Sequence, residues 1–322
     1  MNVLITGGAG FLGRRLTQAL LRRGSLVGPN GRTCDFDTIT LADVVSADDI
    51  TDPRVRHRVG DISDAAFVES LIDTDTTSVF HLAAIVSGMA EADFDLGMRI
   101  NLDASRLLLD ACRARGHKPR VVFASSVAVY GGDMPDIVLD TTALNPQSSY
   151  GMEKAIVELL MNDYSRRGFV DGRVLRLPTI SVRPGRPNAA ASSFASGIIR
   201  EPLKGEEAVC PVDPATKLWL LSPSTVIKSI LHGHDLEASR LGMSRVVNLP
   251  GLSVSVREMV DALERVAGPD VVQRIRWERD ARIERIVASW PGAWDSTRGL
   301  SLGFPTDDSY DAIIRAHIAE TV

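Results

Sequence analysis

Cysteine is scarce in this sequence, and neither charge is in large excess. Cys34, Cys112 and Cys210 lie far apart and are odd in number, so we expect reduced thiols and no disulfide framework. The 36 Lys and Arg residues against 41 Asp and Glu residues leave a net charge of −5. This balance offers no basic footprint for a nucleic acid and no polybasic patch for a membrane surface.

Long apolar runs are absent as well. No run reaches the roughly 18 residues that a membrane-spanning helix needs, and no basic residue precedes Arg14 to mark a signal peptide. His232 and His234 lie two residues apart on a predicted helix and point in different directions, so we predict no metal site. These absences favour a protein of the cytoplasm that binds neither nucleic acids nor membranes.

What the sequence does have is an alternation of apolar strands and amphipathic segments. The alternation predicts an α/β fold with a doubly wound parallel (Rossmann) sheet and right-handed crossovers. The turn-rich stretch 25–37 is long for a connection in such a fold and indicates a surface insertion. Strands are expected at 1–6, 38–43, 55–59, 78–84 and 118–125, and helices from the glycines to Arg23, at 64–74, at 93–115 and from Ser149.

Two lobes are expected along the 322 residues. Residues 1–177 with about 223–250 would form a dinucleotide-binding domain, and residues 178–222 and 251–322 a smaller substrate-binding lobe. The later part of the chain is predicted to contain strands at 218–221 and 246–249, helices opening at Ser222 and Ser253, and a helical segment over 270–289.

A glycine-rich turn follows the first apolar run. Strand, glycine turn and helix together present unpaired backbone N–H groups to a pyrophosphate at the helix N-terminus. A plain strand-to-helix turn is the alternative, but the motif stands in the context that dinucleotide binding requires. We therefore predict a cofactor cradle of Gly7, Gly10, Phe11, Leu12 and Gly13.

Carboxylates end the next two strands. Asp43 is placed to accept both hydroxyls of an adenosine ribose and to repel a 2′-phosphate, so it favours NAD over NADP. Arg14 and Arg15 could argue for NADP, but they lie inside the helix. Asp61 is placed for the adenine amino group, although a helix N-cap role for Asp61 or Ser63 is an alternative. The residues that end the strand at 78–84, Leu82, Ala83 and Ala84, would let a cofactor lie against the backbone.

A set of hydroxyl and amine side chains follows the strand at 118–125. Tyr150 and Lys154 are four residues apart, so they share one face of a helix. A nearby ammonium and a positive nicotinamide ring would both favour the phenolate of Tyr150. If they lowered its pKa by about 3 units, worth about 4 kcal/mol, Tyr150 would act as a general base near neutral pH. Ser126 could hold a substrate hydroxyl. A chance surface pair is the alternative reading of Tyr150 and Lys154.

Together these motifs resemble the extended short-chain dehydrogenases/reductases, also called the NAD-dependent epimerase/dehydratase family. The resemblance rests on the glycine turn, Asp61-Ile62, 81–84, 125–131 and the Tyr150-to-Lys154 spacing. It implies that Ser126, Tyr150 and Lys154 form the catalytic triad, with Lys154 also on the nicotinamide ribose. It further implies that Ile62, Asn101 and Pro178 lie beside NAD and that helices at 98–115 and 150–166 pair in a homodimer.

Within the family, the stretches 25–37, 178–185 and 188–200 resemble members that oxidise the C2 hydroxyl of a four-carbon sugar acid, D-erythronate, to a 2-oxo acid. Such a substrate needs a partner for its carboxylate, and the planar fork of Arg183 is our first candidate. Arg200 is a second candidate, and a structural ion pair is the alternative role for Arg183. Sugar hydroxyls are assigned to Ser126, Tyr150, Thr179, Ser181 and Ser192.

Two other functions remain open at this point. A nucleotide-sugar epimerase or dehydratase would need cations for a diphosphate, which Arg186, Arg200, Lys204 and Lys217 could supply. Members of the family that act on nucleotide sugars commonly carry Asn near position 179, where this chain has Thr179, and this difference weakens that assignment. A non-catalytic NAD sensor would retain the cofactor turn without needing the Ser, Tyr and Lys set.

Overall fold

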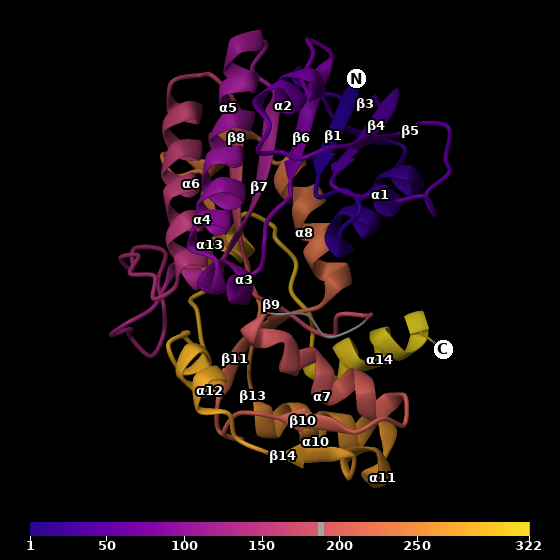
Figure 1. The fold of residues 1–322 in the computed structure, drawn as a ribbon, viewed down its shortest axis with the longest axis vertical. Helices are drawn as coiled ribbons and strands as arrows, with labels where there is room; N and C mark the ends of the chain where they lie inside the picture. The colour runs from indigo at the N-terminus through magenta and orange to yellow at the C-terminus, as the bar shows by residue number, and fades with distance from the viewer. Residues whose placement is uncertain (186–189, 322) are drawn as a thin grey trace.

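The computed structural model describes residues 1–185 and 190–321. A sheet of seven strands, all parallel to their neighbours, fills the upper part of the molecule in Figure 1. Its strand order is β12-β8-β7-β6-β1-β4-β5. From β1 the chain first adds strands toward one edge and then, from β6, toward the other, so the switch point where ligands bind in such sheets lies between β1 and β6. The strands are β1 (Asn2–Thr6), β4 (Thr38–Asp43), β5 (Val55–Val59), β6 (Thr76–His81), β7 (Arg120–Ser126), β8 (Asp171–Leu177) and β12 (Val246–Asn248).

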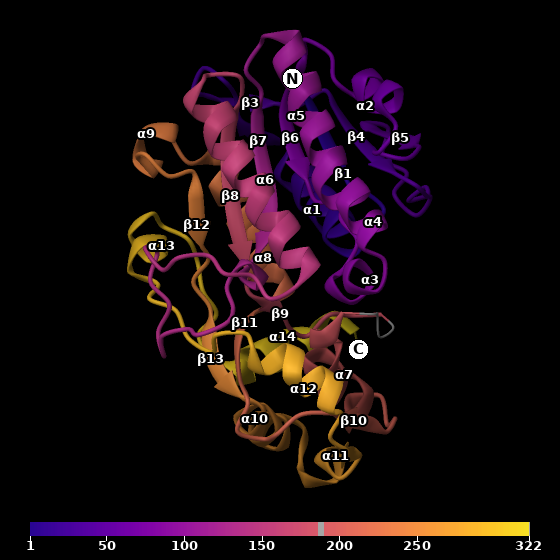
Figure 2. The same cartoon turned by 60° about the vertical axis from the view of Figure 1, so that its left-hand side comes forward.

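Helices cover both faces of this sheet because its strands are apolar on both sides. In β1, Val3 and Ile5 pack into one core, and Leu4 packs into another. The first core lies under α1 (Phe11–Arg23) and α8 (Pro223–Asp235), and the second lies under α2 (Ala65–Leu71), α5 (Ala104–Arg115) and α6 (Ser149–Arg166). Figure 2 shows α5 and α6 in front of the sheet and α1 behind it. The predicted doubly wound fold is therefore confirmed.

Two connections differ from their predictions. The helix expected at 93–115 runs from Phe94 to Arg115, but its middle is a π-helical turn: α4 (Phe94–Gly97), η1 (Met98–Asp103) and α5 follow one another, and a short α3 (Ser87–Ala92) precedes them. The insertion at 25–37 is an antiparallel hairpin of β2 (Ser25–Val27) and β3 (Thr33–Asp35). The Val27 N–H donates to Asp235 at the end of α8, so this insertion is tied to the first core.

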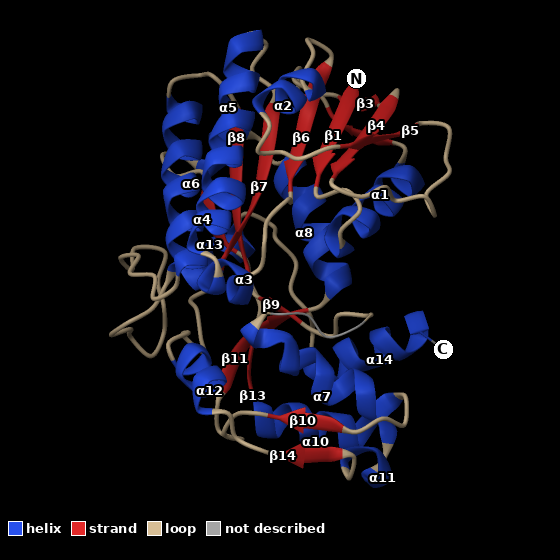
Figure 3. Ribbon diagram, viewed as in Figure 1, coloured by secondary structure: helices blue, strands red, loops and turns tan. Residues whose placement is uncertain are grey.

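A further apolar core organises the lower part of Figure 3, which we call the smaller lobe. Strands β9 (Thr179–Ile180), β11 (Lys217–Leu221) and β13 (Leu252–Ser255) form one small sheet, and β10 (Ala208–Cys210) pairs with β14 (Ile275–Trp277). Helical elements surround them: η3 (Ala191–Ser193), α7 (Phe194–Leu203), α10 (Val256–Ala267), α11 (Pro269–Val272), α12 (Ala281–Ala288) and α14 (Tyr310–Thr321).

Three expectations for the later chain need correction. The helix predicted from Ser253 begins at Val256, because 253–255 pair with β11 and Ser255 caps α10 with Glu258. The segment 270–289 is not one helix, since β14 interrupts it by pairing with β10. After α13 (Thr297–Ser301), Leu302 and Phe304 return to the first core rather than the smaller lobe.

The remaining short elements are η2 (Val127–Val129) after β7 and α9 (Ala238–Leu241) before β12. Over 1–185 and 190–321, none of the helices is long and apolar enough to cross a membrane.

Candidate active site

The glycine turn folds so tightly that no side chain fits at two of its positions. Gly7 has a φ of +70°, and a Cβ on it would lie 2.8 Å from the backbone N of Ala83. A Cβ on Gly13 would lie 2.2 Å from the carbonyl oxygen of Gly7. The turn therefore brings bare backbone of β1, β6 and α1 together.

Helix α1 begins at this turn without a side-chain cap. Gly10 is its N-cap and offers no side-chain hydrogen bond, so the first N–H groups of the helix are left for a ligand. Asp43, at the end of β4, accepts a hydrogen bond from the Ala9 N–H at 3.0 Å. A carboxylate thus stands beside the turn, and the residues present fit a dinucleotide pyrophosphate with its adenosine ribose near Asp43.

A pocket of about 390 Å³ opens next to the turn. Leu82, Ala84 and Pro178 line it together with the glycine-turn residues Gly7, Gly10, Phe11, Leu12 and Gly13. Ala83 is not among the lining residues; its N–H donates to Thr6 at 3.4 Å, behind Gly7.

Asp61 and Ile62 are placed elsewhere. The Ile62 side chain is buried in the core beneath α2. Asp61 accepts hydrogen bonds from the N–H and the hydroxyl of Ser63, both at 2.8 Å. The cap of α2 is Asp64, which accepts from two backbone N–H groups, so neither capping alternative considered for Asp61 or Ser63 is correct.

Asn101 lies in the π-helical turn and is also absent from the pocket lining. Its Oδ1 accepts the N–H of Ile85 at 2.9 Å, and its Nδ2 donates to Glu153 at 2.6 Å. Because Ile85 lines the pocket, Asn101 shapes the wall of the pocket from behind.

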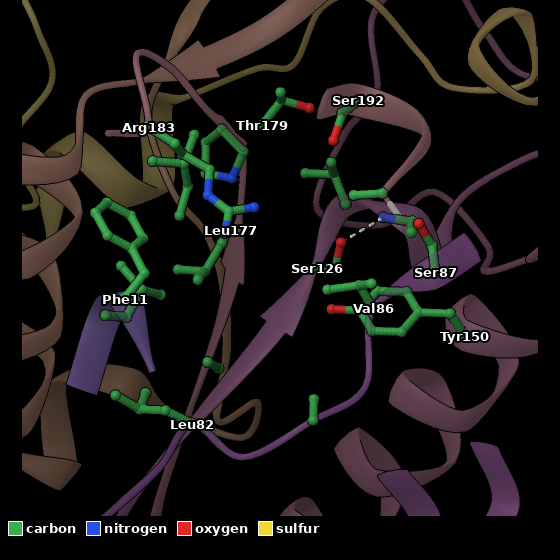
Figure 4. Close-up of a pocket in the computed structure, with 18 of the residues that line it drawn as sticks. Phe11, Leu82, Val86, Ser87, Ser126, Tyr150, Leu177, Thr179, Arg183 and Ser192 are labelled. Carbon is green, nitrogen blue, oxygen red and sulfur yellow. Dashed lines mark hydrogen bonds between the residues drawn. The ribbon is translucent and has the colours of Figure 1, made fainter. Parts of the chain in front are cut away.

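Ser126, Tyr150 and Lys154 all line this pocket, as the sequence predicts for a common site. Ser126 ends β7, and Tyr150 stands in the first turn of α6. Gly151 allows α6 to approach, since a Cβ there would lie 2.1 Å from the Ala128 carbonyl oxygen. Figure 4 shows the hydroxyls of Ser126 and Tyr150 directed toward the same part of the pocket.

The electrostatics of Tyr150 differ from the expectation. Burial raises the pKa of Tyr150 to about 12, while its hydrogen bond with Ser126 and the charge of Arg183 act in the lowering direction. The Lys154 Nζ donates to the Ala124 carbonyl at 3.0 Å and lies 5.6 Å from the centre of the Tyr150 ring. Lys154 alone therefore does not bring the phenol near neutrality, because desolvation outweighs it in this arrangement.

Lys154 is itself perturbed. Burial lowers the pKa of Lys154 to about 8, and the charges of Glu153 and Glu158 oppose that change. Only 2% of its surface is exposed. The ammonium group therefore sits in a desolvated position where its charge acts strongly on its neighbours.

Arg183 lies opposite the hydroxyls. Its guanidinium carbon is 5.3 Å from the centre of the Phe11 ring, and Figure 4 shows the two side chains next to each other. Within the described part of the chain, its guanidinium has no hydrogen-bond or ion-pair partner. Arg200, the second candidate, instead donates to the Arg183 carbonyl at 2.6 Å and pairs with Glu201. The structure thus leaves Arg183 available to an anion and uses Arg200 to hold its backbone.

Thr179 and Ser192 line the pocket near Arg183, but Ser181 does not. The Ser181 hydroxyl is fully buried and bonds with the Tyr310 hydroxyl at 2.7 Å and the Ala195 carbonyl at 3.1 Å. Its assignment to the substrate is thus not supported by its position, because its hydrogen-bonding capacity is taken up in the core of the smaller lobe.

Several lining residues escaped sequence reasoning. Val86 and Ser87 follow β6, Ser196 accepts the Arg183 N–H at 3.0 Å, and Trp290 comes from the end of α12. None of them stands in a motif, and tertiary packing alone brings them to the site. The sequence signal that could have found Ser196 is its position on the same stretch as Arg200.

Of the cations considered for a diphosphate that the structure describes, Arg200 lines the pocket and two lysines do not. Arg186 lies outside the described residues, as does the start of the stretch 188–200. Lys204 and Lys217 are exposed and do not line the pocket, whereas Arg200 lines it but is already bonded.

Comparison with known proteins agrees with this geometry. A model of the NAD dependent epimerase/dehydratase family matches residues 3–235. A protein named D-erythronate dehydrogenase from Cupriavidus necator is 63% identical over 320 residues, which cover 99% of this chain and 98% of that protein. A protein of the same name from Haemophilus influenzae is 47% identical over 319 residues, which cover 99% of each chain.

Solved structures also match over the whole chain. One described as the nucleoside-diphosphate-sugar epimerase from Agrobacterium tumefaciens has a TM-score of 0.93 at 44% identity, covering 100% of this chain and 94% of that one. The L-threonine 3-dehydrogenase of Trypanosoma brucei has a TM-score of 0.86 at 26% identity, covering 99% and 96%. The chain belongs to the NAD dependent epimerase/dehydratase family, the extended short-chain dehydrogenases/reductases that its motifs resemble.

Proposed function

We propose that this protein oxidises the C2 hydroxyl of D-erythronate to a 2-oxo acid with NAD. The names of its two long relatives support this substrate. The structural observation that carries the proposal is the Arg183 guanidinium, which has no hydrogen-bond or ion-pair partner among the described residues and lies across one pocket from Ser126 and Tyr150. A half-buried guanidinium fork with no carboxylate partner among the described residues is suited to a small carboxylate substrate.

NAD would be held mainly by backbone. The first N–H groups of α1 would bind the pyrophosphate, Asp43 the adenosine ribose and Lys154 the nicotinamide ribose. The two arginines that could bind a 2′-phosphate are both engaged: Arg14 pairs with Asp49, and Arg15 pairs with Glu320 through both of its oxygens. This pairing supports NAD rather than NADP.

The side chains divide the chemistry between them. Arg183 would bind the carboxylate of the sugar acid, with Thr179 and Ser192 near its hydroxyls. Ser126 would hold the C2 hydroxyl and Tyr150 would take its proton, while NAD, when bound, supplies the acceptor for the hydride that leaves C2. The charges of Lys154 and Arg183 favour the phenolate. Because the Tyr150–Lys154 pair must first lose a proton, kcat/KM should rise as the pH is raised from 6.

The test is NADH formation, measured by absorbance, across four- to six-carbon sugar acids with a UDP-sugar as control. D-erythronate should give a signal that Tyr150→Phe lowers about thousandfold, within the range of general base catalysis. A Tyr150→Phe variant that produces NADH at nearly the normal rate would overturn the proposed mechanism. A UDP-sugar that turns over while every sugar acid stays inert would overturn the proposed substrate.

A nucleotide-sugar epimerase is the second candidate, and the Agrobacterium tumefaciens structure is the observation in its favour. Such an enzyme would keep NAD tightly bound and show no net NADH. Thr179 in place of Asn, and the distance of Lys204 and Lys217 from the pocket lining, weaken it. The relative at 63% identity also carries more weight than the one at 44%.

The setting of the protein completes the proposal. We propose two domains divided as the sequence suggests, apart from the return of Leu302 and Phe304 to the larger part.

Pairing of α5 and α6 between two copies would cover Leu159, which is 67% exposed. A monomeric mass by light scattering would contradict that dimer. A cytoplasmic location fits the three free cysteines, and cell fractionation would check it.

A further inference from the structure

Glu153 is a buried carboxyl group that the proposed chemistry does not use. It precedes Lys154 on α6, and none of its surface is exposed. Asn101 of the π-helical turn donates to its Oε2 at 2.6 Å, while its Oε1 has no hydrogen-bond partner. Burying a carboxyl group with one oxygen unbonded is costly, so its presence calls for a compensating interaction.

The space around this carboxyl group is shaped to receive it. Gly97, at the end of α4, faces Oε1, because a Cβ on Gly97 would lie 2.3 Å from that oxygen. Asn101 is held in turn by the backbone N–H and carbonyl of Ile85, at 2.9 and 3.3 Å. The carboxyl group is therefore fixed from α4, the π-helical turn and the loop after β6.

The charges that face this site can be named. Burial raises the pKa of Glu153, Asn101 and the positive charge of Lys154 lower it, and Glu91 on α3 raises it. Two carboxylates, Glu153 and then Glu158, raise the pKa of Lys154 and so oppose the effect of its burial, and Glu153 contributes more. Glu153 also raises the pKa of Tyr150. The group that faces Lys154 from β6 is His81, whose pKa falls to about 3 through burial and Lys154, so it stays neutral.

The second carboxylate, Glu158, is already committed. It receives two N–H groups of Arg176, at 2.9 and 2.6 Å, and the Ser125 hydroxyl at 2.5 Å. Its charge is therefore largely matched by the buried Arg176 guanidinium. Glu153 has no such cation of its own among the described residues, which leaves Lys154 as the charge that it can balance.

We propose that Glu153 is a positioning residue: held by Asn101, its carboxylate is the counter-charge of Lys154 and sets the pH at which the Tyr150–Lys154 pair releases its proton. Removing the negative charge favours loss of that proton from either member of the pair. The catalytic groups then titrate at a pH fixed by a residue that does not touch the substrate. The kinetic part of this proposal rests on the proposed oxidation.

The first test is the pH profile of kcat/KM for the oxidation, compared between the natural protein and Glu153→Gln. The rising limb should move to lower pH by about one unit, and the KM for the sugar acid should change less than twofold. A Glu153→Gln profile that keeps its midpoint and falls equally at all pH values would show a structural role only and overturn the proposal.

The second test needs no activity, so it distinguishes failure of this inference from failure of the proposed function. Urea unfolding at pH 7 is measured for Glu153→Gln, Lys154→Met and the double variant. Glu153→Gln should raise the unfolding constant at least fivefold when Lys154 is present, and lower it or leave it unchanged in the Lys154→Met background. Equal effects in both backgrounds would mean that the two charges are not coupled.

Glu91→Gln is the matched control. It removes another carboxylate that acts on Glu153, but Glu91 is exposed on α3, and the amide oxygen of Gln can still accept the Ser149 N–H that Glu91 accepts at 3.0 Å. Its charge is screened by water, so it should shift the pH profile by less than about 0.3 units and leave both unfolding constants within twofold. A shift equal to that of Glu153→Gln would assign the effect to general surface charge and overturn the proposal.

Discussion

One side of the pocket presents mainly backbone atoms and the other presents mainly side chains. On the side of β1 and α1, which we call the glycine side, Gly7, Gly10 and Gly13 present backbone, and the packing at Gly7 and Gly13 leaves no room for a side chain. On the side of the smaller lobe, which we call the arginine side, Arg183 presents its side chain, while the side chains of Ser196 and Arg200 bond to its backbone. The first surface suits a group shared by many enzymes, and the second suits one particular substrate.

This difference separates two kinds of constraint. On the glycine side, a substitution is excluded by backbone contacts, with Ala83 at position 7 and with Gly7 and Gly8 at position 13. On the arginine side, the same role could be filled by several arrangements of polar side chains, because only the position of the charge matters. We therefore expect substitutions on the glycine side to act on NAD, and those on the arginine side to act on the sugar acid.

The largest effect is expected on the glycine side. Gly13→Ala would force a methyl group against the Gly7 carbonyl, so the turn must open and the affinity for NAD should fall more than about hundredfold. The dissociation constant is measured by fluorescence titration. Gly24→Ala is the control: its φ is +77° but nothing lies within 4 Å, so it should cost about 1 kcal/mol of stability and leave NAD binding intact. Unchanged NAD affinity in Gly13→Ala would contradict the role of the turn.

The next effect belongs to the arginine side. Arg183→Met should raise the KM for D-erythronate about hundredfold, since a bidentate charged hydrogen bond to the carboxylate is worth about 3 kcal/mol. Its kcat should fall as well, because the charge of Arg183 lowers the pKa of Tyr150. Steady-state kinetics and NAD titration separate these effects. Arg183→Lys should recover part of the loss, and an equal loss of NAD affinity would erase the contrast between the two sides.

A smaller effect concerns stability. Lys154→Met should raise the free energy of unfolding by about 1 to 3 kcal/mol at pH 7, because burial lowers the pKa of Lys154 from 10.5 to about 8. A lowered folded-state pKa means that the charged amine costs stability below pH 8, and that this cost fades as the pH rises toward 10.5. Urea unfolding should therefore show a gain at pH 7 that has nearly vanished at pH 10. A gain independent of pH would point to packing instead.

The smallest effect tests where the two sides meet. The guanidinium carbons of Arg15 and Arg183 each lie 5.3 Å from the centre of the Phe11 ring. Phe11→Leu should raise the KM for the sugar acid about fivefold, about 1 kcal/mol for a lost cation–π contact, while NAD affinity changes less than twofold. Phe11→Tyr should restore the KM. If Phe11→Leu instead weakens NAD alone, Phe11 belongs wholly to the glycine side.

The contrast also explains what the sequence could predict. The parallel sheet, the glycine turn and the meeting of Ser126, Tyr150 and Lys154 follow from local patterns, since strand ends and helix faces are fixed by short-range periodicity. Local patterns do not predict that Arg200 holds the backbone of Arg183, or that the Ser181 hydroxyl bonds with Tyr310, because each bond joins residues more than ten positions apart. The high pKa of Tyr150 likewise depends on burial, which motif spacing does not report.

Two segments whose structure differs from the helix predicted for them have similar causes. The periodicity of 270–289 is compatible with one amphipathic helix, but β14 finds a pairing partner in β10 over 60 residues earlier in the chain. The stretch 93–115 is apolar at helical spacing throughout, and only contacts from β6 and α6 reveal that its middle is wound differently.

That wider turn at Met98–Asp103 has a consequence for how this chain can change length. A π-helical turn holds one residue more than the α-helical turn it replaces. Deleting a single residue there would restore a regular α-helical turn and leave the later side chains of α5 facing as they do now, whereas a deletion inside α5 would rotate the side chains after it by about 100° around the axis. Cys112 and Leu108, now in the core, would stay there in the first case, so this turn is a point where the chain can lose one residue without a second, compensating change.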